Sequence, residues 1–96
     1  MLSKYKYKDI VWVDLESPTR EEVTSVSEEF SIPALVEEEM LIVSTHSKVE
    51  AYSNLVYLTL HFPKVASGAS KAIDQEVDFI IGKNFLITVH DGFLEP

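Results

Sequence analysis

The sequence predicts an α+β fold with a mixed, largely antiparallel sheet and two helices after the first strand. Three observations support this prediction. A β-branched and aromatic run occupies residues 10–15, two segments with helical spacing of apolar residues follow it, and strand-like runs separated by short turns fill the second half. Helices and most strands therefore occupy separate stretches of the chain, which is typical of the α+β class.

The first strand and the first helix follow one another directly. The segment IVWVDL, residues 10–15, has the composition of a strand. In the next segment, SPTREE, Thr19 and Glu22 have the spacing of a capping box, in which each side chain bonds the backbone N–H of the other residue. Apolar side chains then recur at helical intervals, so we expect a helix from Thr19 to Phe30.

A second helix is expected after Ser31, because Pro33 suits a first helical turn. The buried stripe of this helix consists of Leu35, Val36, Met40 and Val43. The segment STHS that follows is a weak helix former, so we expect the helix to end at Val43 or Ser44.

Two hairpins are expected in the second half. In the first, KVEAY and LVYLTLHF flank a turn at Ser-Asn and Pro63 closes the second strand, after which residues 64–72 form a polar loop. In the second, QEVDFII and FLITVH flank Gly-Lys-Asn, where Gly82 and Asn84 supply the permissive backbone of a turn. The runs DFII and FLITV are apolar at consecutive positions, so part of the sheet should be covered on both faces. The two helices can cover one face, and we expect residues outside this chain to cover the other.

Size and composition restrict the classes of protein to consider. The 96 residues are predicted to form a single domain, 1–96. The absence of cysteine excludes disulfides and thiolate metal sites. The N-terminus lacks the apolar core of a secretory signal, and no apolar run approaches the ~20 residues of a membrane-spanning helix, so no transmembrane segment is expected in this chain.

The charge balance points to cationic partners. Sixteen acidic and eight basic residues give a net charge of −8. This charge repels nucleic acid, so no nucleic-acid partner is expected. It favours divalent cations or basic partners, and the alternative is that the acidity serves only solubility.

Four segments in order resemble the CorA family of magnesium and cobalt transporters. They are WVDLESPTREEV, FSIPALVEEEML, KVEAY and EVDFIIGKNFLITVHDG, and the resemblance extends from Ile10 to Gly92. The last segment is the most specific, since a strand, a Gly-Lys-Asn turn and a second strand match together. The chain is similar to the N-terminal part of the family's cytoplasmic domain, an α/β/α sandwich.

This resemblance implies a function. The family forms homopentameric channels, so the chain would be a cytoplasmic regulatory, metal-sensing domain of a divalent-cation transporter for Mg²⁺ and also Co²⁺, on the cytoplasmic side of the cell membrane. The family's pore signature, Gly-Met-Asn, is absent from this chain. Because the family's subunits join largely through helices outside the matched part, this chain by itself should be a monomer or weak dimer.

The most distinctive polar motif is the glutamate run in LVEEEML. Successive residues of a helix are ~100° apart, so Glu37, Glu38 and Glu39 spread over ~200° and cannot all bind one ion. A solvated helix face explains the run without a metal. The resemblance supplies the alternative, because an acidic residue of this helix helps the family bind a regulatory divalent ion between subunits. That residue corresponds to Glu39, and Glu38 matches the acid before it, so both are candidate metal ligands.

The remaining polar residues give no enzyme site. His46, His61 and His90 lack the spacing of metal ligands and are expected in packing or surface positions. Asp14 is expected to bond the backbone near the start of the first helix. No nucleophile, base and orienting group occur together, so the protein is not expected to be an enzyme.

Three further residues and one loop complete the expectations. Trp12 and Tyr57 should pack in the core or on the sheet, and Lys83 should face solvent. The segment SGAS lacks the Lys-Ser/Thr pair of a phosphate loop. Two alternatives to the regulatory transporter domain stay open. One is a stand-alone acidic interaction module that shares the fold, and the other is a domain of a zinc-transporting relative.

Overall fold

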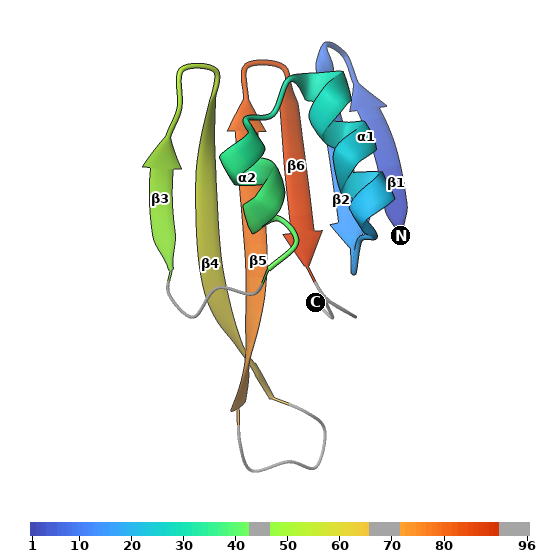
Figure 1. Ribbon diagram of the computed structural model, residues 1–96. Helices are drawn as coiled ribbons and strands as arrows, with labels where there is room; N and C mark the ends of the chain where they lie inside the picture. The colour runs from blue at the N-terminus through green and yellow to red at the C-terminus, as the bar shows by residue number, and fades with distance from the viewer. Residues whose placement is uncertain (43–46, 66–71, 91–96) are drawn as a thin grey trace.

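A six-stranded sheet with strand order β1-β2-β6-β5-β4-β3 runs through the computed structural model, which describes residues 1–42, 47–65 and 72–90. The elements in chain order are β1 (Leu2–Tyr7), β2 (Ile10–Glu16), α1 (Arg20–Phe30), α2 (Ala34–Glu39), β3 (Lys48–Ala51), β4 (Leu55–Val65), β5 (Ala72–Gly82) and β6 (Phe85–His90). Both helices lie on the same side of the sheet (Figure 1). The predicted α+β class is confirmed.

The sheet is mixed because of a single parallel pair, β2 with β6. The other four pairings are antiparallel. The parallel pair joins the N-terminal hairpin to the four strands of the second half, and it aligns the carboxyl ends of β2 and β6 at one end of the sheet. As a result, Glu16 lies opposite His90 in the register although 74 residues separate them in the chain.

The strand β1 is absent from the elements predicted from sequence. Its lysines Lys4 and Lys6 alternate with Tyr5 and Tyr7, so it lacks the continuous apolar character of the other strands. It is an edge strand, where charged side chains are common, and its pairing with β2 places Tyr5 beside Trp12 with ring centroids 5.1 Å apart. Pairing with β2 rather than burial of its own side chains stabilises β1.

The capping box that begins α1 is confirmed. Thr19 Oγ1 accepts a hydrogen bond from the backbone N–H of Glu22 at 3.1 Å, and Glu22 Oε1 accepts one from the backbone N–H of Thr19 at 2.9 Å. The helix ends at Ser31, whose φ of 56° is left-handed and turns the chain toward α2.

The second helix differs from its prediction in length and in one buried position. Pro33 is the residue before the helix rather than in its first turn, and the helix ends at Glu39. Backbone hydrogen bonds from Leu41 and Ile42 to the carbonyls three residues earlier tighten the chain there into a turn. The predicted end at residues 43–44 lies outside the described residues.

Only part of the predicted apolar stripe of α2 is buried. Val36 and Met40 lie in the core, while Leu35 is 70% exposed, so its predicted burial was wrong. The physical reason is the shortness of the helix, which has six residues and contacts the sheet through one turn. Val36 points to the sheet from this turn, and Leu35, about 100° away around the helix, points to solvent.

Both predicted hairpins form, but the strands β4 and β5 are longer than predicted. They pair over eleven residues each, and Pro63 continues β4 instead of closing it. β3 pairs with β4 only as far as Thr59, so within the described part of the chain the later residues of β4 lie at an edge of the sheet. A proline is tolerated at such an edge, because its missing N–H breaks no hydrogen bond to a third strand. Residues 66–71 of the predicted loop lie outside the described part.

Gly82 is required for space rather than for an unusual backbone angle. Neither Gly82 nor Asn84 has a φ in the left-handed region, so the predicted role of a permissive backbone was wrong. A Cβ added at Gly82 would lie 2.1 Å from a carbon of the Phe85 ring. The ring of Phe85 packs against Phe30 at a centroid distance of 4.7 Å, so the glycine lets the turn close over an aromatic contact with α1. Lys83 is exposed at this turn, as predicted.

The core lies between the two helices and one face of the sheet, which we call the helix face. It consists of Val13, Leu15, Val23, Val26, Ile32, Val36, Met40, Leu55, Tyr57, Ile80, Ile87 and Val89. Alternation along each strand places every second side chain on this face. Tyr57 is 1% exposed, which confirms its predicted packing.

The opposite face of the sheet, which we call the open face, is apolar and carries no helix among the described residues (Figure 1). Its exposed large side chains include Tyr5, Trp12, Val49, Val56 and Ile81. Trp12 is 43% exposed and packs against Tyr5 on the sheet, which is the second of the two positions predicted for it. No helix in the described part has the length and hydropathy of a membrane span.

The capping box gives a direct test of the helix start. Thr19→Ala should lower the free energy of unfolding by about 1 kcal/mol, because the N–H of Glu22 loses its acceptor. Urea denaturation followed by circular dichroism measures this change. Ser25→Ala, at an exposed position of the same helix, is the matched control and should leave stability nearly unchanged. Equal effects of the two substitutions would contradict the role of the capping box.

Candidate functional site

The short helix α2 points its first two glutamates toward α1. Glu37 Oε2 accepts a hydrogen bond from Thr24 Oγ1 at 3.3 Å, and Glu38 Oε1 lies 3.6 Å from Arg20 Nη1. The Glu38 and Arg20 side chains are both about two thirds exposed, so solvent screens this ion pair. Glu38 is therefore a solvated acid with a weakly held partner.

Glu39 turns away from α1 and toward the sheet. Its Oε2 lies 2.5 Å from Lys48 Nζ, and the same nitrogen lies 3.6 Å from Glu50 Oε1. Lys48 also sits over the ring of Tyr57, 5.6 Å from the centroid. The three glutamates thus have separate partners, in agreement with their predicted spread around the helix, and Glu39 is the one that meets a second carboxylate.

The position of Lys48 follows from the sheet register. β3 pairs antiparallel with β4, with Lys48 opposite Thr59 and Glu50 opposite Tyr57. Since Tyr57 and Thr59 are buried on the helix face, Lys48 and Glu50 lie on that face beneath the end of α2. The carboxylate of Glu39 raises the pKa of Lys48, so the side chain is an ammonium ion throughout the physiological pH range.

A second polar cluster lies further along the same two strands. Asp78 is 2% exposed and accepts hydrogen bonds from Tyr57 Oη at 3.0 Å and Thr59 Oγ1 at 3.1 Å. Burial, followed by its hydrogen bond with Glu76, raises the pKa of Asp78 to about 7. Burial also raises the pKa of Tyr57 above its ordinary value. The sequence shows this cluster only as an aspartate inside the apolar run EVDFII.

The histidines occupy different environments. His61 on β4 lies 3.1 Å from Ser47 Oγ and 3.8 Å from Glu76 Oε1, and its side chain is 19% exposed. These contacts are compatible with the packing or surface position expected of it. His46 lies outside the described residues. Among the residues described, no group of three or more His, Cys, Asp or Glu side chains could hold a metal ion.

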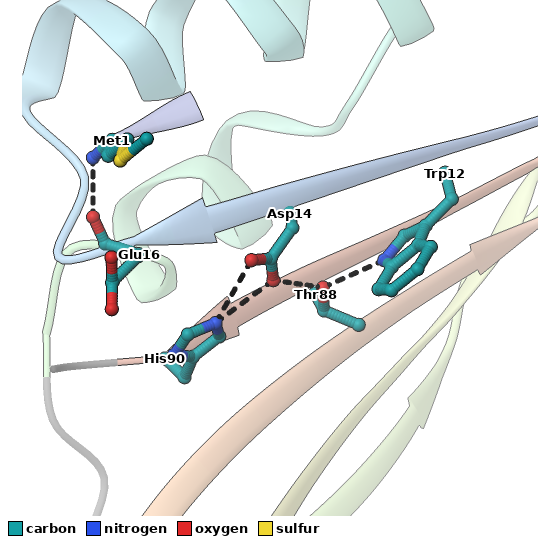
Figure 2. A network of polar contacts seen from close by, with 6 residues as sticks. All are labelled: Met1, Trp12, Asp14, Glu16, Thr88 and His90. Atoms are coloured by element: carbon teal, nitrogen blue, oxygen red, sulfur yellow. Dashed lines mark hydrogen bonds and ion pairs between the residues drawn. The ribbon is translucent and has the colours of Figure 1, made fainter. Parts of the chain in front are cut away.

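Figure 2 shows a third cluster, on the open face where β2 and β6 run parallel. Asp14 Oδ1 accepts a hydrogen bond from Thr88 Oγ1 at 2.7 Å, and His90 Nε2 lies 3.0 Å from the same oxygen. Trp12 Nε1 donates to Thr88 Oγ1 at 3.0 Å. The expected bond from Asp14 to the backbone near the helix start was wrong, because strand alternation directs Asp14 to the face opposite the helices.

The contacts of this third cluster link two strands. The Thr88 hydroxyl donates its proton to Asp14 and accepts one from Trp12, so its bonds join the β2 side chains to β6. His90 is 8% exposed, and its Nδ1 has no hydrogen-bond partner in the part of the chain that the structure describes. The cluster binds β2 to β6 across their parallel pairing. It is a group of polar side chains on the open face, where most side chains are apolar.

The sequence and the fold of this chain are similar to those of known proteins. Residues 7–96 match the family described as CorA-like Mg²⁺ transporter protein. The full-length CmaX protein has a similar fold, with a TM-score of 0.74 and 10% identity over 90% of this chain and 27% of that chain. No curated protein sequence matches this chain.

Two soluble domains are similar as well. The soluble domain of CorA from Methanocaldococcus jannaschii has a TM-score of 0.68 and 17% identity, over 88% of this chain and 33% of that chain. The ZntB cytoplasmic domain from Vibrio parahaemolyticus RIMD 2210633 has a TM-score of 0.68 and 13% identity, over 88% of this chain and 34% of that chain. At these identities the likeness shows the fold alone, and the chain spans about a third or less of each solved chain.

The buried carboxyl of Asp78 gives a prediction about pH. The folded state holds a proton on Asp78 up to a pH of about 7, whereas the unfolded state loses it at about 4. The stability that this protonated carboxyl contributes is therefore fully present below about pH 4 and is lost as the pH rises through about 7. The free energy of unfolding should therefore fall between pH 5 and pH 8, by more in the wild type than in Asp78→Asn. Urea denaturation of both proteins at the two pH values measures the difference.

The exposed Asp9 supplies the control for this experiment. Asp9→Asn makes the same change in charge and should keep the pH dependence of the wild type. If Asp78→Asn kept it too, burial of Asp78 would not be its cause.

Proposed function

Because the chain belongs to the CorA-like Mg²⁺ transporter family, we propose that it is a regulatory, metal-sensing domain of a divalent-cation transporter. The observation that carries this proposal is the carboxylate of Glu39, which α2 holds at the rim of the sheet against only a monovalent ammonium ion. The net charge of −8 supports the proposal, because it raises the local concentration of cations around the domain.

Glu39 and Glu38 are the proposed ligands of a regulatory divalent ion. The Glu39 side chain is 23% exposed and the Glu38 side chain 65% exposed, so an ion from solution can reach both. Mg²⁺ prefers octahedral oxygen ligands and keeps several waters when a protein offers few carboxylates. A site of this kind binds weakly on one subunit and gains affinity when a neighbouring subunit adds a ligand.

The proposed mechanism is electrostatic. Acidic faces of adjacent subunits repel one another, and divalent ions bound between them offset the repulsion and favour a closed arrangement. When the internal Mg²⁺ concentration falls, the ions dissociate and the closed arrangement loses population. Mg²⁺ would then be both the regulatory ion and the transported ion, with Co²⁺ as a further cargo.

The remaining parts of the proposal concern the whole protein. The chain would form, with residues 1–96 as a single domain, the N-terminal part of a longer subunit on the cytoplasmic side of the cell membrane. Five such subunits would assemble around a pore. The apolar open face supports this, because exposed side chains such as Trp12 and Val49 are of the kind that further residues of a longer subunit cover.

Two other functions fit the same fold. A domain of a zinc-transporting relative is one alternative, compatible with the fold shared with the ZntB cytoplasmic domain, and comparing Zn²⁺ uptake with Mg²⁺ uptake by the full-length protein distinguishes the two cargoes. The acidic surface is also compatible with a stand-alone interaction module. The reading frame beyond Pro96 distinguishes that alternative, since a transporter requires two further apolar segments of ~20 residues each.

The regulatory role of Glu39 is testable in the full-length transporter. Glu39→Ala should weaken inhibition of transport by internal Mg²⁺ several-fold, because the ion loses a carboxylate ligand. Uptake into vesicles loaded with increasing Mg²⁺ measures the inhibition curve. The control Glu28→Ala removes an exposed acid from α1 and should leave the curve in place. An unchanged curve for Glu39→Ala would remove this residue from the mechanism.

The assembly state of the chain by itself gives a second test. Residues 1–96 alone should sediment as a monomer or a weak dimer, because the contacts that join subunits in the family would come from helices beyond this part. The open face can support weak dimerisation through its apolar side chains. A stable pentamer in sedimentation velocity would contradict this expectation.

A further inference from the structure

The contacts of Lys48 describe a site that already holds a cation. Its ammonium nitrogen lies 2.5 Å from Glu39 Oε2 and 3.6 Å from Glu50 Oε1, and the ring of Tyr57 lies beneath it. Two carboxylates from different elements, α2 and β3, therefore meet at one positively charged atom. An ion that took the place of this atom would lie next to Glu39 and within 3.6 Å of Glu50 Oε1, so the Glu50 side chain would have to move closer to bind Mg²⁺ at about 2.1 Å.

The two carboxylate oxygens depend on Lys48 for their compensation. Glu39 Oε2 and Glu50 Oε1 are both inaccessible to solvent, and within the described residues neither has a hydrogen-bond partner beyond the ion pair with Lys48. One positive charge thus faces two negative charges at partly buried positions. A divalent cation would match the charge of the pair, whereas the ammonium leaves one negative charge uncompensated.

We propose that Lys48 is a tethered cation that occupies the Glu39–Glu50 carboxylate pair in the metal-free protein and is displaced when a divalent ion binds there. This inference rests on the proposed metal-sensing function and adds two residues to it. Glu50 becomes a second carboxylate ligand from the same subunit. Lys48 becomes a regulatory residue that competes with the metal ion.

The position of Lys48 suits such an exchange. β3 is an edge strand of four residues, and the Lys48 side chain is 34% exposed, so its flexible stem can turn outward without breaking the core. Once released, the ammonium regains its hydration. Because the metal ion must break the existing ion pair, Lys48 lowers the apparent affinity and raises the ion concentration at which the sensor responds.

Titration of the purified protein with Mg²⁺, followed by nuclear magnetic resonance of the Lys48 side chain, tests the displacement directly. In the metal-free protein the Lys48 ammonium should give the signal of a group in an ion pair with Glu39, and at saturating Mg²⁺ it should give the signal of a solvated ammonium. This measurement uses the wild type and needs no substitution. A Lys48 side-chain signal that is the same with and without saturating Mg²⁺ would overturn the proposal.

Variants then measure the competition. Lys48→Met keeps an apolar stem without the charge and should tighten the Kd for Mg²⁺ about two- to fivefold, the change expected on releasing a partly exposed ion pair. Glu50→Gln should weaken binding. Lys4→Met is the matched control, because it makes the same charge change at the opposite edge of the sheet, where Lys4 pairs with Glu29 at 2.7 Å. Equal tightening by both lysine variants would reduce the effect to net charge and refute the proposal.

The same titrations separate this inference from the function on which it rests. If Glu39→Gln leaves Mg²⁺ binding unchanged, the metal-sensing function fails, and the displacement of Lys48 fails with it. If Glu39→Gln abolishes binding while Lys48→Met leaves the Kd unchanged, the sensing function stands and only the competition by Lys48 is overturned. Thermal unfolding of each variant without metal shows whether a changed Kd comes from a changed fold.

Discussion

Strand alternation within one sheet is the constraint on which the rest of this structure depends. Each residue of a strand faces either the two helices or the open face, and the pairing register decides which residues share a face. The helix face contains the core and also Lys48, Glu50 and Asp78, so the candidate metal site and the buried acid belong to one layer. The open face contains the Asp14 cluster and the exposed apolar side chains. A shift of register by one residue would exchange these two sets.

The acids of this layer differ in their surroundings. Asp78 is enclosed by Tyr57 and Thr59, and burial raises its pKa to about 7, whereas Glu39 lies 2.5 Å from the ammonium nitrogen of Lys48. Burial without a nearby cation disfavours the charged form of a carboxyl. This difference is the reason for proposing Glu39, rather than the more deeply buried Asp78, as the ligand of an ion.

Several features required more than the local sequence. The shortness of α2 exposes Leu35, and the contact of the Phe85 ring explains Gly82 better than turn chemistry does. In β1, lysines alternate with tyrosines, and such exposed lysines are not typical of a buried strand. Only its pairing with β2 identifies it as a strand. Asp14 was assigned to the nearest helix start, because the chain position of Thr88 and His90, more than 70 residues later, gives no sign that they are neighbours.

The sequence by itself determined the α+β class, the capping box of Thr19 and Glu22, the two hairpins and the spread of the three glutamates, because each depends on residues within one or two turns of each other. It also identified the family, through short segments in a fixed order. Only the tertiary structure decided that Glu39 faces Lys48 and Glu50, that Asp78 is enclosed, and that β2 joins β6 in parallel. These contacts join residues that are distant in the chain, and the register and layering of the sheet, rather than any local preference, bring them together.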